Sequence, residues 1–293
     1  MVDMHLHTYY SDGTLSPEEL VKRAADRGIL TMAITDHDGL NGIKEALEAG
    51  EKYGVKVIPG LEFSANMPFR ELEPERFSKE GTGDDGGTII NMHILGYDID
   101  VENEALILAV EQMRRKREER NRKLLKALQS IGLQIEEEDL IIRQGQDYIG
   151  KPNFALALKK KGYIETTKEA NTPGRFLRHP AARKIHREKI HVREALSLIK
   201  NAGGYAVLAH PMKVKFEGLP ESDKFNMLEK LLDKLTGWGL SGMECYYSSH
   251  TPEQTASLLK MAEKRGMIVT EGSDFHGPDF DPDLDIGVTG NTK

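Results

Sequence analysis

The alternation of short apolar runs with helical patterns is the feature that most constrains the fold of this chain. It fills the first hundred residues and begins again at Tyr205, with a long, mostly helical stretch between. Strands that alternate with helices are typical of a parallel sheet. We therefore expect an α/β protein, a parallel α/β barrel with a helical insertion between its fourth and fifth strands. The predicted strands span Val2–His7, Leu30–Thr35, Lys56–Ser64, Ile89–Ile99, Tyr205–His210, Gly242–Tyr247 and Met267–Gly272.

Local signals divide the chain further. Ser16 is followed by proline and then by Glu19, the capping-box arrangement that starts a helix, and the same arrangement recurs from Thr251 to Gln254. Residues 66–88 are polar and end in a glycine-rich run, which predicts a loop. The pattern as a whole predicts three segments. These are a first part of the barrel (1–101), a mostly helical insertion or lid domain (102–194) and a second part of the barrel (195–293).

Composition excludes several classes of protein. The chain has 293 residues, 39% hydrophobic and 30% charged, with a net charge of −7, which is typical of a soluble globular protein and not of a bulk-basic binder of duplex DNA. No apolar run approaches the ~20 residues that span a bilayer, so no membrane partner is expected. Its start lacks a signal-peptide pattern. The single Cys245 excludes a disulfide scaffold and a cysteine-based zinc site, and a cytoplasmic setting is the simplest expectation.

Imidazole and carboxylate side chains recur at or near the ends of the predicted strands. His5 and His7 lie two residues apart in the first strand, so both project from one face. The carboxyl ends of parallel barrel strands converge on one mouth, where active sites are built. A single histidine is more often a hydrogen-bonded core or surface residue, but the repeated placement favours a metal cluster. Six imidazoles and three carboxylates predict two or three divalent ions. The candidate ligands are His5, His7, Asp12, His37, Glu62, His93, His210, Asp274 and His276.

Five short motifs resemble those of a known family. They are Asp3-Met4-His5-Leu6-His7-Thr8, Thr35-Asp36-His37-Asp38, Pro59-Gly60-Leu61-Glu62, Ala209-His210-Pro211 and Gly272-Ser273-Asp274-Phe275-His276. In this order they resemble the successive motifs of the PHP family, named for polymerase and histidinol phosphatase. The resemblance implies a distorted (β/α)7 barrel that holds up to three Mn, Fe or Zn ions, with the nine candidate residues as their ligands.

Within that family the chain is most similar to the stand-alone metal-dependent phosphoesterases. The helical insertion and the sequence Glu244-Cys245-Tyr246-Tyr247, with His250, carry this resemblance. Members of the group act on nucleoside 3′,5′-bisphosphates or on the 5′ ends of short RNAs. We therefore expect hydrolysis of a nucleotide phosphate ester through a metal-activated hydroxide, with a phosphorylated small molecule, a nucleotide or a short RNA end as the partner.

A basic segment interrupts the acidic chain. Residues 101–200 carry 22 Lys and Arg against 14 Asp and Glu, whereas the rest carries 18 against 33. In the helix predicted from about 105 to 131, the apolar stripe continues through Arg117 and then Arg120 or Asn121 before it returns to leucine. A guanidinium on the buried side of a helix needs an anionic partner. That partner is either a substrate phosphate or a structural Asp or Glu, and the sequence leaves both open.

A second basic position follows the same helix. Gly150-Lys151-Pro152-Asn153 resembles a family motif that usually reads Gly-Arg-Pro-His. Lys151 keeps the charge of the arginine but loses its forked geometry. We expect Arg117, Arg120 and Lys151 to bind the substrate phosphate and to offset charge that develops on it.

Other polar residues are expected to support the centre. Asp36 and Asp38 flank His37 and are candidates to orient imidazoles, and Glu244 either does the same or merely ends a strand. The leaving group needs an acid, for which His210 and His250 are both candidates.

Three alternative functions remain open. An amidohydrolase-like C–N hydrolase would also place His-x-His after its first strand, although it has no use for a basic insertion. A non-catalytic metal-binding accessory module is a second alternative, and a phosphatase of the histidinol-phosphate type is a third. The identity of the metal is left open, because imidazole and carboxylate ligands suit several divalent ions.

Overall fold

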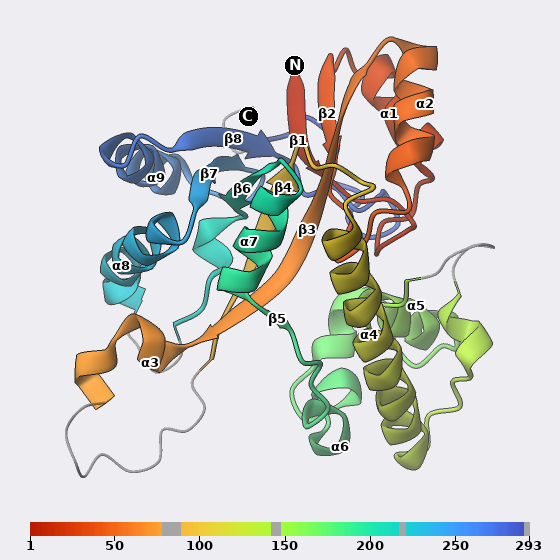
Figure 1. Cartoon of the computed structure of the whole chain (residues 1–293). Coiled ribbons are helices and arrows are strands. Elements are labelled where there is room, and N and C mark those ends of the chain that lie inside the picture. Colours follow the sequence, from red (N-terminus) through yellow and green to blue (C-terminus); the bar gives the residue numbers. More distant parts are fainter. Residues whose placement is uncertain (78–88, 142–147, 217–220, 290–293) are drawn as a thin grey trace.

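The strands form one curved sheet that nearly closes into a barrel (Figure 1). The structure, a computed structural model, describes residues 1–77, 89–141, 148–216 and 221–289. Within these residues the sheet runs in the order β1-β2-β3-β4-β6-β7-β8, and the short β5 pairs with β3. The predicted α/β class is confirmed. The strands are β1 (Val2–Leu6), β2 (Thr31–Ile34), β3 (Lys56–Pro68), β4 (Ile89–Tyr97), β5 (Ile190–His191), β6 (Tyr205–Leu208), β7 (Leu240–Tyr247) and β8 (Ile268–Gly272).

The barrel closes between its first and last strands. The amide of Asp274 donates to the carbonyl oxygen of His5 at 2.9 Å, and the amide of His7 donates to that of Phe275 at 3.1 Å. These hydrogen bonds bring the segment after β8 alongside β1. The two ends of the chain's βα pattern therefore meet at the same mouth.

Strand β4 is an exception to the predicted parallel sheet. It is antiparallel to both of its neighbours, β3 and β6, whereas the pairs β1–β2, β2–β3, β6–β7 and β7–β8 are parallel. A parallel neighbour needs a crossover connection, usually a helix, whereas an antiparallel neighbour does not. In the described part of the connection after β3, only the four-residue helix α3 (Phe69–Leu72) and a 3-10 turn (Pro74–Phe77) are present.

Strand β3 is longer than the sequence predicts. It has 13 residues and ends at Pro68, so the first part of the predicted loop 66–88 is strand. Its alternation explains the error: Phe63, Ala65 and Met67 are buried in the core, while the polar Ser64 and Asn66 between them line a cavity. The glycine-rich run of that predicted loop lies outside the described residues.

Helices cover the outside of the barrel. In Figure 1, α1 and α2 lie beside the first strands, and α8 and α9 lie beside the last ones. Both predicted capping boxes are confirmed, because Ser16 and Glu19 exchange hydrogen bonds at the start of α1, and Thr251 and Gln254 do so at the start of α9. These helices are α1 (Pro17–Asp26), α2 (Ile43–Tyr53), α7 (Val192–Asn201), α8 (Lys224–Gly237) and α9 (Pro252–Lys264).

The long helix α4 (Glu104–Ser130) connects two apolar cores. Leu106 and Met113, in its first half, belong to the barrel core. Leu124 and Leu128, in its second half, belong to a separate core with α5 (Lys151–Lys160) and α6 (Pro180–Arg183). The polar residues that interrupt its apolar stripe lie where the helix passes from one core to the other.

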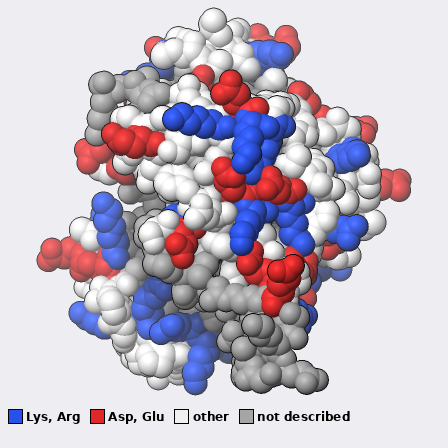
Figure 2. Space-filling view, turned by 90° about the vertical axis from the view of Figure 1, so that its left-hand side faces the viewer, with Lys and Arg blue, Asp and Glu red and all other residues white. Residues whose placement is uncertain are grey.

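Charges of both signs are interspersed on the face formed by α3, α8 and α9 (Figure 2). Ion pairs connect the elements there, for example Lys264 with Glu229 at 2.8 Å and Lys230 with Glu73 at 2.7 Å. In the described residues, no helix is both long enough and apolar enough to cross a membrane.

Candidate active site

The nine predicted ligand residues come together at the mouth of the barrel. Their imidazole nitrogens and carboxylate oxygens form four overlapping groups, and within each group all ligand atoms lie within 4.8 Å of one another. The groups are His7, Asp12, His37 and His276; His5, His7 and Asp274; His5, Glu62 and His210; and His37, Glu62 and His93.

Local backbone geometry positions these side chains. His5 lies in β1 and His7 directly after it, and both belong to one ligand group. His210 and Asp274 follow β6 and β8 with positive φ angles of 28° and 58°. Non-glycine residues in such conformations are strained and cluster at functional sites. Gly272 precedes Asp274, and a Cβ there would collide with the side chains of His5 and Glu244. Only glycine allows β8 to approach the centre so closely.

His93 reaches the centre from the middle of the antiparallel β4. In the register between β4 and β3 it lies opposite Ser64, which follows Glu62 by two residues. Its Nδ1 is 3.0 Å from Oε1 of Glu62. His93 and Glu62 were predicted among the residues at or near strand ends, but both lie within strands.

The donor set fits divalent cations. Glu62 lies at its middle: its Oε2 is 2.7 Å from Nδ1 of His37 and 3.5 Å from Nε2 of His7. Even so, within the described part of the chain none of these three buried atoms has a hydrogen bond, nor has Nε2 of His5. Buried polar atoms without partners are costly, and cations between them would satisfy all of them at once. Imidazole nitrogens with carboxylate oxygens suit Mn, Fe and Zn.

The protonation of the centre is set by burial and by its own charges. Burial, together with the neighbouring His276, lowers the pKa of His7 to about 3, and burial lowers the pKa of His93 to about 4. Burial opposes ionisation of Asp12, but the facing imidazoles of His37 and His276 outweigh it and hold the pKa of this carboxyl below its usual range. Neutral imidazoles and ionised carboxylates are the forms that bind metals.

His276 has the opposite shift. Burial disfavours its charged form, but the carboxylates of Asp12 and Asp274 outweigh burial and raise its pKa to about 9. A cation at this position would therefore displace a proton from His276.

Glu244 and Asp36 lie behind the imidazoles. Oε1 of Glu244 is 2.9 Å from Nδ1 of His5, and Oε2 accepts a hydrogen bond of 2.6 Å from the amide of His210. This contact leaves Nε2 of His5 facing the centre. Asp36 accepts a hydrogen bond of 2.5 Å from the hydroxyl of Ser11, whose oxygen lies 3.4 Å from Nδ1 of His7. Glu244 therefore contacts an imidazole directly, whereas Asp36 reaches one through Ser11.

Asp38 differs from the expectation that it orients an imidazole. Its carboxylate accepts hydrogen bonds from Arg117 and, at 2.6 Å, from Arg187, and it also accepts one from the amide of Ser64. Arg117 further donates to the hydroxyl of Tyr148 and stacks on that ring at 3.9 Å. The sequence left a phosphate and a carboxylate open as the partner of Arg117, and in the structure that partner is the carboxylate of Asp38.

We call the cluster of nine predicted ligand residues the metal centre. A basic cavity of about 830 Å³ lies beside it. Arg120, on its wall, is only 6% exposed, and in the described residues its Nε and Nη1 have no hydrogen-bond partner. Burial and the neighbouring Arg117 lower its pKa to about 10, and burial with Arg187 lowers that of Lys189 to about 8. The cavity shares Asp12, His37 and His93 with the metal centre, and its cationic residues are Arg117, Arg120, Lys151, Arg183, Arg187 and Lys189.

The comparisons with known proteins agree with this geometry. The sequence model of the PHP domain matches residues 3–236. The chain belongs to the PHP domain family. It is therefore an enzyme of the metal-dependent phosphoesterase class, a phosphoric ester hydrolase.

Similar proteins match almost the whole length of this PHP chain. A 5′-3′ exoribonuclease of Haemophilus influenzae is 28% identical over 277 residues, which are 94% of this chain and 90% of the relative. A 3′,5′-nucleoside bisphosphate phosphatase of Chromobacterium violaceum is 26% identical over 284 residues, with 94% and 87% covered. A solved structure described as an amidohydrolase from Chromobacterium violaceum, with bound sulfate and no metal, covers 97% of this chain and 89% of its own, with a TM-score of 0.78 at 26% identity.

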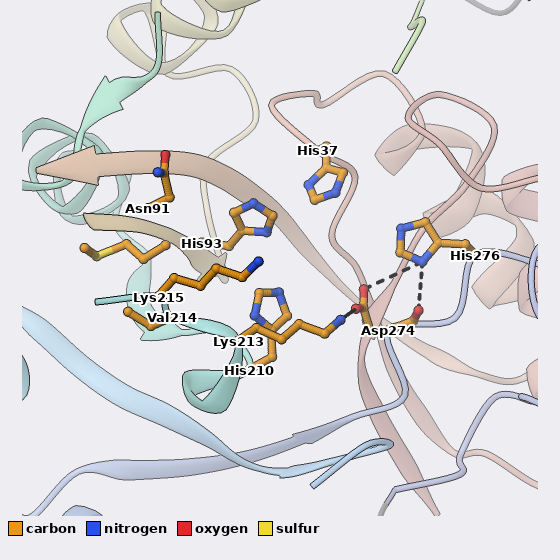
Figure 3. Close-up of a pocket in the computed structure, with 10 residues that line it drawn as sticks. His37, Asn91, His93, His210, Lys213, Val214, Lys215, Asp274 and His276 are labelled. Carbon is orange, nitrogen blue, oxygen red and sulfur yellow. Dashed lines mark hydrogen bonds and ion pairs between the residues drawn. The ribbon is translucent and has the colours of Figure 1, made fainter. Parts of the chain in front are cut away.

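The PHP centre has a further cavity of about 430 Å³ on the side of β6 and β8 (Figure 3). Lys213 extends across it toward Asp274, and its Nζ lies 3.0 Å from Oδ2 of that carboxylate. Tyr247 donates to the same oxygen at 2.8 Å. Neither was predicted as a site residue, although Tyr247 ends the motif that begins at Glu244 and Lys213 follows His210 by only three positions.

Arg187 and Lys189 were missed as well. They alternate along the segment that leads into β5, and both line the basic cavity. Their i, i+2 spacing before Ile190 was the available signal, but the sequence predicts no strand there. Without β5, nothing ties this segment to β3.

Two motif residues have other surroundings. Asn153 is a capping residue: its Oδ1 accepts from the amide of Gly150 at 2.8 Å and its Nδ2 donates to the carbonyl of Leu140. Lys151, beside it, lines the basic cavity.

His250 is in none of the four ligand groups, and its Nδ1 donates to the carbonyl of Cys245 at 3.0 Å. His210 is in one of those groups.

Proposed function

We propose that this PHP enzyme hydrolyses a phosphate ester of a nucleotide that carries a second phosphate, such as a nucleoside 3′,5′-bisphosphate or the 5′ end of a short RNA. The observation that carries the proposal is Arg120, a buried guanidinium in a cavity beside the metal centre, whose Nε and Nη1 have no hydrogen-bond partner among the described residues. A buried cation without a partner is costly unless an anion pairs with it. A second phosphate of the substrate is such an anion.

The cations of the cavity divide into two kinds. Arg117 and Arg187 are neutralised in part by Asp38, which lies between them. Arg120, Lys151, Lys189 and the exposed Arg183 also line the cavity, and among the described residues none of these four forms an ion pair with a carboxylate. We therefore assign the second phosphate to Arg120, Lys151 and Lys189, with Arg120 as the forked donor.

The scissile phosphate belongs at the nine-residue centre. Two or three divalent ions of Mn, Fe or Zn there would polarise the phosphorus–oxygen bonds and supply a water nucleophile at neutral pH. His5, Glu62 and His210 with His37 and His93 would hold them on the β3 side, and His7 and Asp274 with Asp12 and His276 on the β8 side. Lys213 stands at this second side, where it can offset charge on the phosphoryl oxygens. A C–N hydrolase would have no use for these cations.

Phosphate release tests the proposal. The substrates are adenosine 3′,5′-bisphosphate, the corresponding 3′- and 5′-monophosphates, short 5′-phosphorylated RNA and histidinol phosphate, and metal content is measured on the same protein. We expect the bisphosphate or the RNA to be preferred. Arg120→Gln should lower kcat/KM for the preferred substrate by about tenfold to hundredfold and leave the monophosphates unchanged.

The matched control is Arg122→Gln, on the exposed side of the same helix. It should leave all substrates unchanged. Arg120→Gln should also raise Tm in buffer without anions, because it removes an unpaired buried charge. Equal losses for bisphosphate and monophosphate would contradict the role of Arg120, and preference for histidinol phosphate would contradict the proposed substrate class.

A further inference from the structure

A second cavity, of about 420 Å³, borders the metal centre on another side. It lies between the segment after β2 and the first half of α4. It shares His37, Arg117 and Tyr148 with the basic cavity, so the two cavities are adjacent. Cavities of this size hold small molecules or parts of them.

Its two walls are aliphatic. Ile107 and Val110 lie three residues apart on α4, and Arg117 lies about two turns beyond Val110. Leu40 and Ile43, before and at the start of α2, line the opposite side. A slot between two aliphatic surfaces suits a flat and weakly polar group, because burying such a group removes apolar surface from water.

The rim of the cavity is polar. Asn41 and Lys44 lie on the α2 side, and Glu111 and Arg114 on the α4 side. Amide, carboxylate and guanidinium groups together can hydrogen-bond the edge of a heteroaromatic ring. The aliphatic walls suit a phosphate less well, because they would leave its oxygens without partners.

We propose that this cavity, which we call the base slot, binds the nucleobase of the substrate. The proposal rests on the proposed function and deepens it, since it distinguishes nucleotides from other phosphorylated molecules. In a nucleotide, one ribose joins the base to both phosphates. The base must therefore lie next to the phosphate sites, and the base slot borders the metal centre at His37 and the basic cavity at Arg117.

The test fills the base slot. Val110→Trp places a bulky ring between the two walls, and Leu108→Trp is the matched control, because Leu108 lies on the same helix, is 58% exposed and does not line the slot. KM is compared for adenosine 3′,5′-bisphosphate and for ribose 3,5-bisphosphate, which lacks the base. We expect Val110→Trp to raise KM about tenfold for the nucleotide and to leave the base-free substrate unchanged. Leu108→Trp should change neither value.

A second variant and a binding measurement keep the result decisive. Ile107→Phe narrows the slot with a smaller change in volume and should act in the same direction. Binding of adenosine, which has no phosphate, is followed by saturation-transfer NMR and should be lost in Val110→Trp and kept in Leu108→Trp. This measurement needs no turnover, so it still decides the base slot if the wild-type protein hydrolyses no bisphosphate and the proposed function fails.

Several outcomes would overturn the base slot. These are equal KM changes for the nucleotide and the base-free substrate, unchanged KM values for both, or adenosine binding that survives both Val110→Trp and Ile107→Phe. The same variants assayed on a short 5′-phosphorylated RNA identify the source of the base. A rise of KM for either the mononucleotide or the RNA supports the slot, and the substrate that responds is the one whose base occupies it.

Discussion

The metal centre and the basic cavity share a boundary but are built in different ways. The ligands of the metal centre are fixed by strand register and by glycine and positive-φ positions at the barrel mouth. The cations of the basic cavity come from α4, α5, α6 and the segment before β5, and ion pairs to Asp38 hold two of them. The metal centre therefore depends on backbone geometry, whereas the basic cavity depends on charge balance between distant segments.

The largest effect is expected from Glu62→Gln. Glu62 lies within hydrogen-bonding distance of imidazoles in two ligand groups, and Gln keeps its size but removes its charge. We expect loss of bound metal and a fall in kcat of about a thousandfold or more. Metal analysis and phosphate release check this. Glu71→Gln is the control, because Glu71 pairs with His191 away from the centre. Retained metal and activity in Glu62→Gln would contradict the assignment.

Glu244→Ala should have the next largest effect. It leaves Nδ1 of His5 and the amide of His210 without their acceptor. We expect a loss of activity or metal affinity of about tenfold to hundredfold, with partial recovery in Glu244→Gln. Titration of the protein with Mn²⁺ measures it. Full metal affinity in the alanine variant would mean that backbone geometry alone fixes the centre.

Asp38→Asn tests the other site. It leaves two buried guanidiniums without their carboxylate, and a broken buried ion pair costs about 3 kcal/mol. We expect a lower Tm that sulfate restores more strongly than in the wild type, a change in kcat/KM of about tenfold, and unchanged metal content. Asp285→Asn is the control, because Asp285 also lies between two arginines, Arg23 and Arg27, but far from the cavity. A loss of metal in Asp38→Asn would show that the two sites are not separable.

The smallest effect is expected from pH acting on Lys189. Burial and Arg187 lower its pKa from 10.5 to about 8, so between these values the unfolded chain binds more protons than the folded one, and the contribution of Lys189 to stability rises with pH. Affinity for an anion should fall over the same step. We expect KM for the bisphosphate to rise by roughly fivefold from pH 7 to pH 9. The rise should be absent in Lys189→Gln, and an unchanged rise there would assign it to another group.

The gathering of the candidate ligands was predicted from the sequence more completely than the fold around them. All nine candidate ligands meet, because the period of two along a strand and the convergence of strand ends depend only on local spacing. The direction of β4 and the length of β3 were wrong. Strand direction depends on the path of the connection, and the polar Asn66 in β3 resembles a loop residue unless one knows that it faces a cavity.

The basic cavity was only partly predictable. The interrupted stripe of α4 correctly indicated buried polar residues at Arg117 and Arg120. It could not choose between a phosphate and a carboxylate as the partner of Arg117, since Asp38 lies 79 residues away in the chain. Arg187 and Lys189 were not predicted, because their place on the cavity wall depends on β5, which the sequence does not predict.

Local sequence patterns are enough to predict which side chains gather at the barrel mouth and which positions of α4 are both buried and charged. Which of those charges neutralise each other depends on the three-dimensional fold. Asp38 binds Arg117 and Arg187, and Arg120 is left without a hydrogen-bond partner at its Nε and Nη1 among the described residues. The ligands could be predicted because their spacing along a strand is a short-range property of the sequence. A buried charge, in contrast, is balanced by whichever opposite charge the fold brings within a few ångströms, wherever it lies in the chain.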